Sequence, residues 1–197
     1  KFVKKKSNSI LEVLKILREK DLISDYYSVL VNKRIPVFAG MGGGTSNAVC
    51  LIKYFTGNKI NKNLSSILDK KIGSDLRLFF HKQGFLKNLK TINNFRRKFR
   101  LYFLLVYPNI KCSTAYVYSK VKKYSIKSQY SFSKIKDKSK YIEFLANKDN
   151  DLQSIVEKKY PNIKKLIIEI GQKKGCYFSR MTGSGSVCYG VFKSQKT

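Results

Sequence analysis

The most unusual segment of the sequence is IPVFAGMGGGTSNA, which spans residues 35–48. Four glycines stand close together there, in a chain that is otherwise rich in lysine. Glycine is costly to order and contributes no side-chain packing, so such a cluster indicates a sharp backbone bend or a ligand that approaches the main chain. The segment therefore predicts either an ordinary glycine-rich turn or a binding site made of main-chain amides.

A phosphate group is the ligand that best fits this segment. The following residues, 46–55, predict a helix, and the first amides of a helix are unpaired and partly positive. A glycine turn in front of the helix removes the side chains that would keep a phosphate away. The cradle would consist of Gly40, Gly42, Gly43 and Gly44, with hydroxyls from Thr45 and Ser46 and the amide of Asn47.

Two well-known phosphate motifs do not fit the segment. A P-loop needs a lysine after its last glycine, and this chain has Thr45 at that position. The dinucleotide fingerprint needs a third glycine where Thr45 also stands. The Ser46 hydroxyl is nevertheless a candidate ligand for a magnesium ion bound to phosphate.

The complete pattern from Pro36 to Ala48, P-x-x-x-G-M-G-G-G-T-S-N-A, resembles the ATP-binding motif of the GHMP kinases, a family of small-molecule kinases. The resemblance implies ATP and Mg²⁺ as cofactors. It also implies that ATP is bound by a continuous segment: Pro36, Val37, Phe38, Ala39, Gly40, Met41, Gly42, Gly43, Gly44, Thr45, Ser46 and Asn47.

A second stretch, KIGSDLRLFF, is similar to the G-A-D-V-P-F-F motif of the same family. The resemblance makes Asp75 the catalytic base, because a buried carboxylate beside the acceptor hydroxyl can take its proton during phosphoryl transfer. The alternative is that Asp75 caps a helix or faces water. Arg77 replaces the family's proline and would place a cation near Asp75 or against a phosphate.

A third stretch, SRMTGSGSVCYGVF, resembles the C-terminal glycine motif of the family. The alternative is a plain β-hairpin with a flexible turn. NDL, which starts at Asn150, resembles the beginning of a helix in these kinases. The third match implies a substrate-binding role for Arg180, Thr182, Gly183, Ser184 and Gly185.

The implied activity is transfer of the γ-phosphoryl group of ATP to an alcohol. The triple glycine followed by T-S-N-A is most similar to the family member that acts on the 2-hydroxyl of a cytidine-diphosphate-linked methylerythritol. That reaction belongs to the non-mevalonate route to isoprenoid precursors, in the bacterial cytoplasm or the plastid stroma. Another GHMP kinase with a different alcohol acceptor is the first alternative.

A basic nucleic-acid-binding protein is the second alternative, because 41 lysines and arginines against 12 acidic residues give a formal charge of +29. The lysines are spread along the whole chain, and Asn, Ile, Tyr and Phe are abundant with them, as expected of AT-rich coding DNA. Composition is therefore the preferred explanation of the charge. It does not explain the glycine segment.

Cysteine and histidine usage argues against a metal–thiolate centre. The 4 cysteines lie far apart without a C-x-x-C pair, and His81 is the single histidine. A reducing compartment fits these free thiols. The sequence predicts neither a membrane span nor a secretory signal.

The elements that must position these residues follow from periodicity and turn signals. We expect an amphipathic helix over 7–23 with Ser9 and Glu12 as a capping box, and a strand over 26–35 before the glycine segment. The remaining expectations are helices over 46–55 and 63–73, a buried strand over 99–108, a helix capped by Ser113 or Thr114, an exposed loop over 121–140, helices over 150–161 and 162–175, and a hairpin over 176–192.

The resemblance implies an α+β fold in two parts. Residues 1–98 would form the ATP-binding part, similar to domain 2 of ribosomal protein S5, and residues 99–197 a ferredoxin-like part. The family's first strand, with its A-K-x-N-L motif, and its last elements have no counterpart, so the chain is expected to be a piece of a longer kinase, truncated at both ends. The exposed sheet edge would favour pairing of copies, such as a homodimer.

Overall fold

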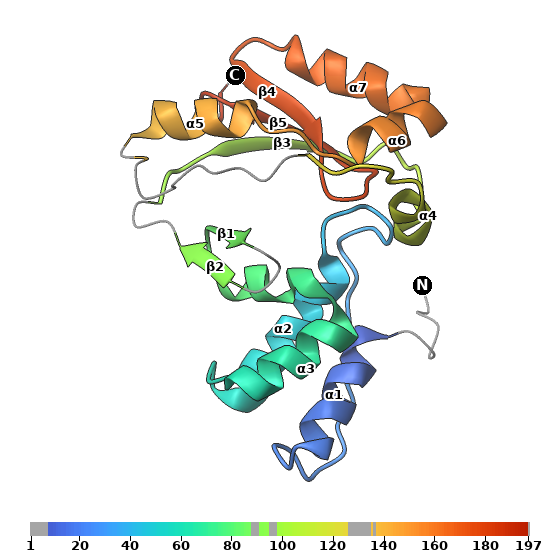
Figure 1. Cartoon of the computed structure of the whole chain (residues 1–197), viewed down its shortest axis with the longest axis vertical. Coiled ribbons are helices and arrows are strands. Elements are labelled where there is room, and N and C mark those ends of the chain that lie inside the picture. Colours follow the sequence, from blue (N-terminus) through green and yellow to red (C-terminus); the bar gives the residue numbers. More distant parts are fainter. Residues whose placement is uncertain (1–7, 88–90, 95–97, 126–134, 136, 197) are drawn as a thin grey trace. The chain divides into compact units, whose positions relative to one another are not determined.

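A computed structural model of the chain describes residues 8–87, 91–94, 98–125, 135 and 137–196. The chain forms two compact units. The first contains residues 1–34 and 42–95, and the second contains residues 35–41 and 96–197. Both helices and strands are present (Figure 1), so the predicted α+β class is confirmed. The expected boundary at residue 98 between the ATP-binding part and the ferredoxin-like part stays a prediction.

The first unit is built from helices that pack around one apolar core. Its elements are α1 (Ser9–Glu19), α2 (Gly43–Thr56), α3 (Lys62–Ile72) and the 3₁₀ helix η2 (Ser74–Phe80). A short antiparallel pair, β1 (Gly84–Lys87) and β2 (Thr91–Asn94), follows them. The largest fully buried side chains of this unit are Val13, Leu17, Ile52, Leu68 and Leu76.

The helix starts of the first unit differ in part from the sequence prediction. Asn8, not Ser9, is the N-cap of α1, and its Oδ1 accepts a hydrogen bond from the amide of Ile10 at 3.0 Å. The predicted capping box is therefore wrong. Ser9 instead donates its hydroxyl to the carbonyl of Gly44 at 3.0 Å, which ties α1 to the start of α2.

The predicted strand over residues 26–35 is also wrong, because that segment forms no strand in the structure. Tyr26 and Leu30 are 89% and 99% exposed. Strand propensity is realised only where a neighbouring strand supplies ladder hydrogen bonds and a packing surface. The segment pairs with no strand among the described residues, so its β-branched and aromatic side chains do not produce one.

The second unit is a three-stranded antiparallel sheet with helices packed on it. The strands are β3 (Tyr102–Val106), β4 (Cys176–Met181) and β5 (Cys188–Phe192), in the order β3-β5-β4. Figure 1 shows α6 (Gln153–Lys159) and α7 (Pro161–Gly171) over the sheet. The core that they cover includes Cys112, Val117, Val156, Ile163, Met181 and Cys188.

Two shorter helices complete the second unit, α4 (Thr114–Ser119) and α5 (Lys138–Ala146). Ser113 is the N-cap of α4, as predicted, and Asp137 caps α5. The predicted hairpin at the end of the chain is confirmed, since β4 and β5 are antiparallel neighbours. Half of the expected loop over 121–140 lies outside the described residues, and its last three residues, 138–140, belong to α5, so the loop prediction is wrong there.

The predicted burial of the strand at 99–108 is wrong, although the strand exists as β3. Phe103, Leu104 and Leu105 are 54%, 42% and 51% exposed. Among the described residues β3 pairs with β5 alone and forms the edge of its sheet. An edge strand has fewer neighbours, so an apolar sequence does not guarantee burial there.

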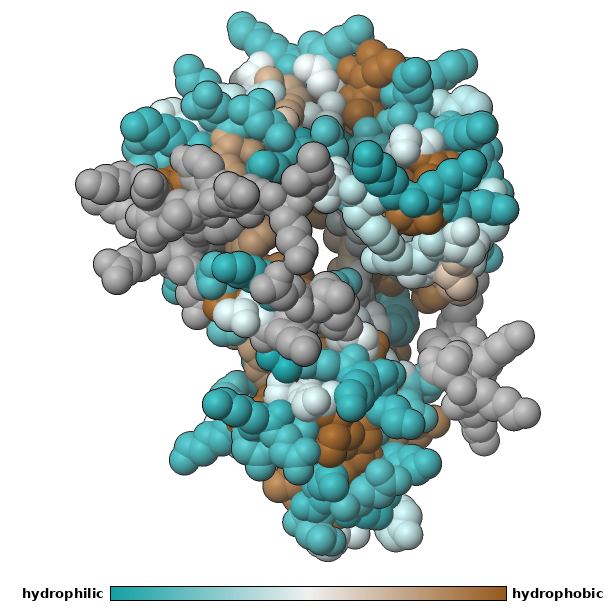
Figure 2. All heavy atoms as spheres, viewed as in Figure 1, coloured by the Kyte–Doolittle hydropathy of each residue, from teal (hydrophilic) through white to brown (hydrophobic). Residues whose placement is uncertain are grey.

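Polar surface is distributed over the elements of both units. Figure 2 shows hydrophilic residues scattered over the helices and loops of each unit, as the even spread of lysine along the sequence predicts. In the described part of the chain, no helix has the length and apolar character needed to cross a bilayer.

Candidate active site

The start of α2 is the part of the glycine segment that belongs to the first unit. Gly42 is its N-cap, with a left-handed φ of 63°, and no side chain caps the helix. The amide of Ser46 makes the first helical bond, to the carbonyl of Gly42 at 2.8 Å. The amides of Gly43, Gly44 and Thr45 precede that bond and have no acceptor in the helical ladder. This helix start has the donors that an anion needs.

Gly42 and Gly44 are glycines for different reasons. A Cβ on Gly42 would lie 2.5 Å from the ring of Phe79, so this position is closed to a side chain by packing as well as by its φ. A Cβ on Gly44 would meet only the Ser9 hydroxyl, at an ordinary 3.6 Å. The fold therefore tolerates a small side chain at residue 44, and its absence there needs another reason.

Asp75 lies in the first turn of η2 and is exposed, so the expected burial of this carboxylate is wrong. The same 3₁₀ helix contacts α2 at Gly42 through the Phe79 ring. Lys53 of α2 also donates to the carbonyl of Phe79 at 3.2 Å. Leu76, directly after Asp75, is 1% exposed and fixes this part of η2 in the core. The structure therefore places the predicted base on an element that packs along the helix with the free amides.

Arg77 is held by a carboxylate on α3. Its Nε donates to Oδ2 of Asp69 at 2.5 Å, and the two side chains are 27% and 15% exposed. The Coulomb attraction within such a pair, largely removed from solvent, is screened less by water than in an exposed pair. The cation that replaces the family's proline thus joins η2 to α3.

The first half of the glycine segment, residues 35–41, packs in the second unit against the glycine turn between β4 and β5. The amide of Val187 donates to the carbonyl of Ala39 at 3.1 Å. The Thr182 hydroxyl donates to the carbonyl of Gly40 at 3.2 Å. A Cβ on Gly40 would lie 2.4 Å from the carbonyl oxygen of Thr182. The two glycine segments that sequence similarity marked as functional are therefore in direct backbone contact.

The turn itself is ordered by hydrogen bonds to its own backbone and to neighbouring elements. The amide of Gly185 donates to the carbonyl of Thr182 at 2.9 Å. The hydroxyls of Ser184 and Thr114 lie 2.9 Å apart, and the Ser186 hydroxyl donates to the carbonyl of Ile110. This is more than a flexible hairpin turn, because each of its sides is fixed to a different segment of the second unit.

Arg180 contacts the end of α5. Its two terminal nitrogens each lie 3.2 Å from the carbonyl oxygen of Leu145, and one lies 3.3 Å from that of Ala146. A cation at a helix C-terminus satisfies free carbonyls and complements the helix dipole. This contact gives Arg180 a role in the fold, and its predicted role in substrate binding stays a prediction.

The buried thiols do not supply a nucleophile. Burial, together with smaller contributions from Glu157 and Cys112, raises the pKa of Cys188 to about 12. Burial also raises the pKa of Cys112, although Lys159 opposes the shift. Both groups therefore stay protonated near neutral pH. Among the described residues, no group of three His, Cys, Asp or Glu side chains could hold a metal ion.

The sequence analysis missed the side chains that hold the second glycine turn in place. Thr114 contacts Ser184, and Asn150 and Gln153 make hydrogen bonds to the backbone at residues 181–183. The only signal for them was the NDL stretch at the beginning of a helix. Its partners are backbone groups about thirty residues away, which no local pattern identifies.

Comparison with known proteins agrees with this geometry. A family model described as GHMP kinases C terminal matches residues 132–197. The second unit thus contains a GHMP kinase C-terminal domain. The 4-diphosphocytidyl-2-C-methyl-D-erythritol kinase of Pelagibacter ubique is 38% identical over 97% of this chain and 69% of its own length. The chain therefore belongs to the 4-diphosphocytidyl-2-C-methyl-D-erythritol kinase family.

Other relatives carry the same name. The kinase of Buchnera aphidicola is 30% identical over 96% of this chain, and that of Thermoanaerobacter pseudethanolicus is 31% identical over 94%. The chain spans 65% and 66% of the length of these two relatives. A crystal structure of 4-(cytidine 5'-diphospho)-2C-methyl-D-erythritol kinase covers the whole chain with a TM-score of 0.69 at 18% identity, and the match covers 73% of that structure's chain. This likeness supports the fold.

Proposed function

We propose that this protein transfers the γ-phosphoryl group of ATP to the 2-hydroxyl of 4-diphosphocytidyl-2-C-methyl-D-erythritol. The observation that carries the proposal is the start of α2, a helix with no side-chain cap and a glycine-rich N-terminus in a member of this kinase family. Such a helix start binds phosphate through its amides and its partial positive charge. The same reaction on another alcohol is the nearest alternative.

The residues of the glycine segment would bind ATP by its phosphates. Gly43, Gly44 and Thr45 would donate their main-chain amides, and Asn47 would add a side-chain amide. Pro36–Met41 precede these residues and are anchored on the turn at Thr182–Gly185. Phosphoryl transfer depends mainly on positioning and electrostatic stabilisation, and fixed amides provide both at no cost of reorganisation.

The described residues fit a magnesium ion that is bound mainly by phosphate oxygens. Mg²⁺ usually keeps several waters and is bound by few protein ligands together with the phosphates of its substrate. Ser46 would contribute its hydroxyl. The ion would neutralise the negative charge that develops on the phosphate oxygens.

Asp75 would act as the general base for the acceptor hydroxyl. An exposed carboxylate in the first turn of η2 is open to a substrate, while Leu76 and the Arg77–Asp69 pair hold the backbone around it. Its role would be to accept the proton as the hydroxyl oxygen attacks the γ-phosphorus. Thr182, Gly183, Ser184 and Gly185 would contact the acceptor.

Replacing Asp75 by Asn tests this assignment. We expect turnover to fall by at least about a hundredfold, because general-base catalysis contributes about 10²–10⁴-fold. The thermal shift caused by ATP should stay unchanged, since the amides of α2 are untouched. The measurement is steady-state turnover with ATP and the proposed acceptor, together with thermal denaturation.

Glu19→Gln is the matched control, because Glu19 is an exposed carboxylate whose contact with Lys15 is a long 3.9 Å. It should leave turnover at the wild-type level. Full turnover in Asp75→Asn would refute the role of Asp75 as general base. If the wild-type protein phosphorylates a different alcohol and not the proposed acceptor, the assignment of the acceptor is refuted. Tight RNA binding without any response to ATP would favour the nucleic-acid alternative.

A further inference from the structure

We propose that Asn150 is a positioning residue that holds the Thr182–Gly185 turn, and through it the first half of the ATP-binding segment. The proposal rests on the proposed function. It assigns a role to the NDL stretch, which the mechanism above does not use. The argument depends only on contacts within the second unit, to which residues 35–41 and 96–197 both belong.

The carboxamide of Asn150 makes three hydrogen bonds. Its Nδ2 donates to the carbonyl of Met181 at 3.0 Å and to the carbonyl of Gly183 at 2.8 Å. Its Oδ1 accepts from the amide of Leu152 at 3.0 Å, which fixes the side chain against the beginning of α6. One side chain thus joins the last residue of β4, the glycine turn and a helix start.

These bonds require an amide side chain. Two N–H donors and one acceptor are used together, and among side chains of this length only asparagine has that set. An aspartate at residue 150 would lose both donors. It would also place negative charge beside two carbonyl oxygens, which are themselves partly negative.

The turn that Asn150 holds is the support of the ATP-binding segment. Gly183 approaches Gly40 so closely that a Cβ on Gly183 would lie 2.8 Å from the carbonyl oxygen of Gly40. The Thr182 hydroxyl bonds the same carbonyl, and the amide of Val187 bonds Ala39. A displacement of the Gly183 carbonyl would therefore move the backbone at residues 39–40.

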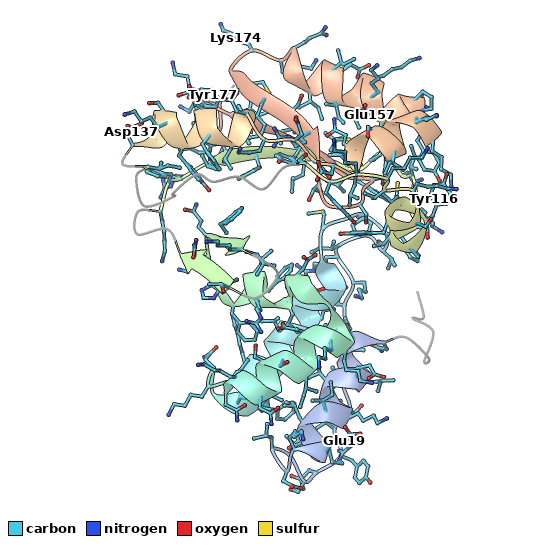
Figure 3. All side chains as sticks on the ribbon, viewed as in Figure 1. Glu19, Tyr116, Asp137, Glu157, Lys174 and Tyr177 are labelled. Carbon is cyan, nitrogen blue, oxygen red and sulfur yellow. The ribbon has the colours of Figure 1, made fainter. Side chains whose placement is uncertain are left out.

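Gln153 provides a second anchor at the same strand end. Its Oε1 accepts from the amide of Met181 at 3.0 Å, while its Nε2 donates to Glu157 at 2.7 Å. Figure 3 labels Glu157 on α6, on the helix that Asn150 precedes. Gln153 bonds the strand alone, whereas Asn150 also bonds the turn at Gly183, and the contact of Thr114 with Ser184 lies one residue further along. Loss of the Asn150 donors should therefore loosen the turn at Gly183 while β4 stays in place.

The test compares Asn150→Asp with Asp151→Asn in the same protein. Asp151 is the adjacent residue, and its carboxylate contacts Ser125 and not the turn. We expect kcat/KM to fall by about thirtyfold to a hundredfold in Asn150→Asp, because a displacement of about 1 Å costs about that much in a positioned site. Asp151→Asn should remain within about twofold of the wild type.

The pH profile separates positioning from a general structural role. The two carbonyl oxygens should disfavour the charged form of the introduced carboxyl and so raise its pKa above the ordinary value. Protonation then restores one O–H donor, so the activity of Asn150→Asp relative to the wild type should rise as the pH falls below neutrality. Asn150→Ala, which loses the same bonds without a charge, should lose activity with no such pH dependence, and it replaces the Asp variant if that variant does not fold.

Amide hydrogen exchange gives a readout that does not depend on activity. The amides of Gly185 and Val187 should exchange at least about tenfold faster in both Asn150 variants, because each variant loses more than one of the hydrogen bonds that hold the turn and the strand end. Wild-type exchange and kcat/KM in these variants would overturn the proposal. An inactive wild type would refute the proposed function, while the exchange rates would still decide whether Asn150 holds the turn.

Discussion

Two helix starts in the first unit use opposite solutions to the same problem. At α3, Asn61 caps the helix, and its Oδ1 accepts from the amide of Leu64 at 2.8 Å. At α2, Gly42 offers no side chain, and the helix carries further glycine at its first position. Each helix end has the same unpaired amides, so the difference lies in what satisfies them.

The comparison teaches that α2 lacks the stability of a side-chain cap at the helix start whose amides we propose to bind ATP. A side-chain N-cap contributes about 1 kcal/mol, and α3 has this contribution while α2 does not. The loss at α2 is offset by packing, since Ala48, Val49 and Ile52 of the same helix are buried. The start of α2, where we propose that the nucleotide binds, thus contributes less stability than a capped helix start, and the buried core side chains of α2 compensate.

The most damaging substitution in this comparison is Gly42→Ala. It should lower the free energy of unfolding by about 3 kcal/mol, because the left-handed φ costs about 1–2 kcal/mol and the Cβ overpacks the Phe79 ring at 2.5 Å. Chemical denaturation measures the change. A stability equal to that of the wild type would show that this glycine is not required by the fold.

The second substitution, Asn61→Ala, removes the cap of α3. It should lower the free energy of unfolding by about 1 kcal/mol and leave the affinity for ATP unchanged, because the amides of α3 have no proposed ligand. Denaturation and a nucleotide titration check the two expectations. Weaker ATP binding in this variant would remove the functional distinction between the two helix starts.

The smallest effect on stability is expected from Gly44→Ala, and it has the opposite sign. Alanine in a helix is favoured over glycine by about 0.5–1 kcal/mol, and the Cβ has room beside Ser9. The free energy of unfolding should therefore rise, while ATP binds about tenfold more weakly because the methyl group crowds the phosphate. Unchanged ATP affinity in a stabilised protein would contradict the phosphate site at the start of α2.

Local patterns were sufficient where the physics is local. Gly57 and Gly73 follow the last residues of α2 and α3, close to the predicted helix ends at 55 and 73, and Ser113 caps α4 as predicted. The similarity of the glycine segments to the GHMP kinases led to the family that the relatives confirm. Chain geometry near a turn or a cap depends on few residues, so a short sequence stretch carries the information.

Predictions failed where a distant partner decides the outcome. The β-rich stretch at 26–35 forms no strand, and β3 is apolar but exposed at a sheet edge. Ser9 bonds Gly44 and not its own helix, and Arg77 pairs with Asp69. None of these partners follows from spacing along the chain.

The sequence by itself was sufficient to locate the two glycine segments, to order most of the helices and to identify the kinase family, because each of these depends on contiguous residues. Only the tertiary structure decided that Gly40 and Gly42 are required by close packing while Gly44 is not, and that Asn150 reaches the turn at Gly183. The physical reason is that steric exclusion and hydrogen bonding act over a few ångströms in space, between residues whose separation along the chain is unrestricted.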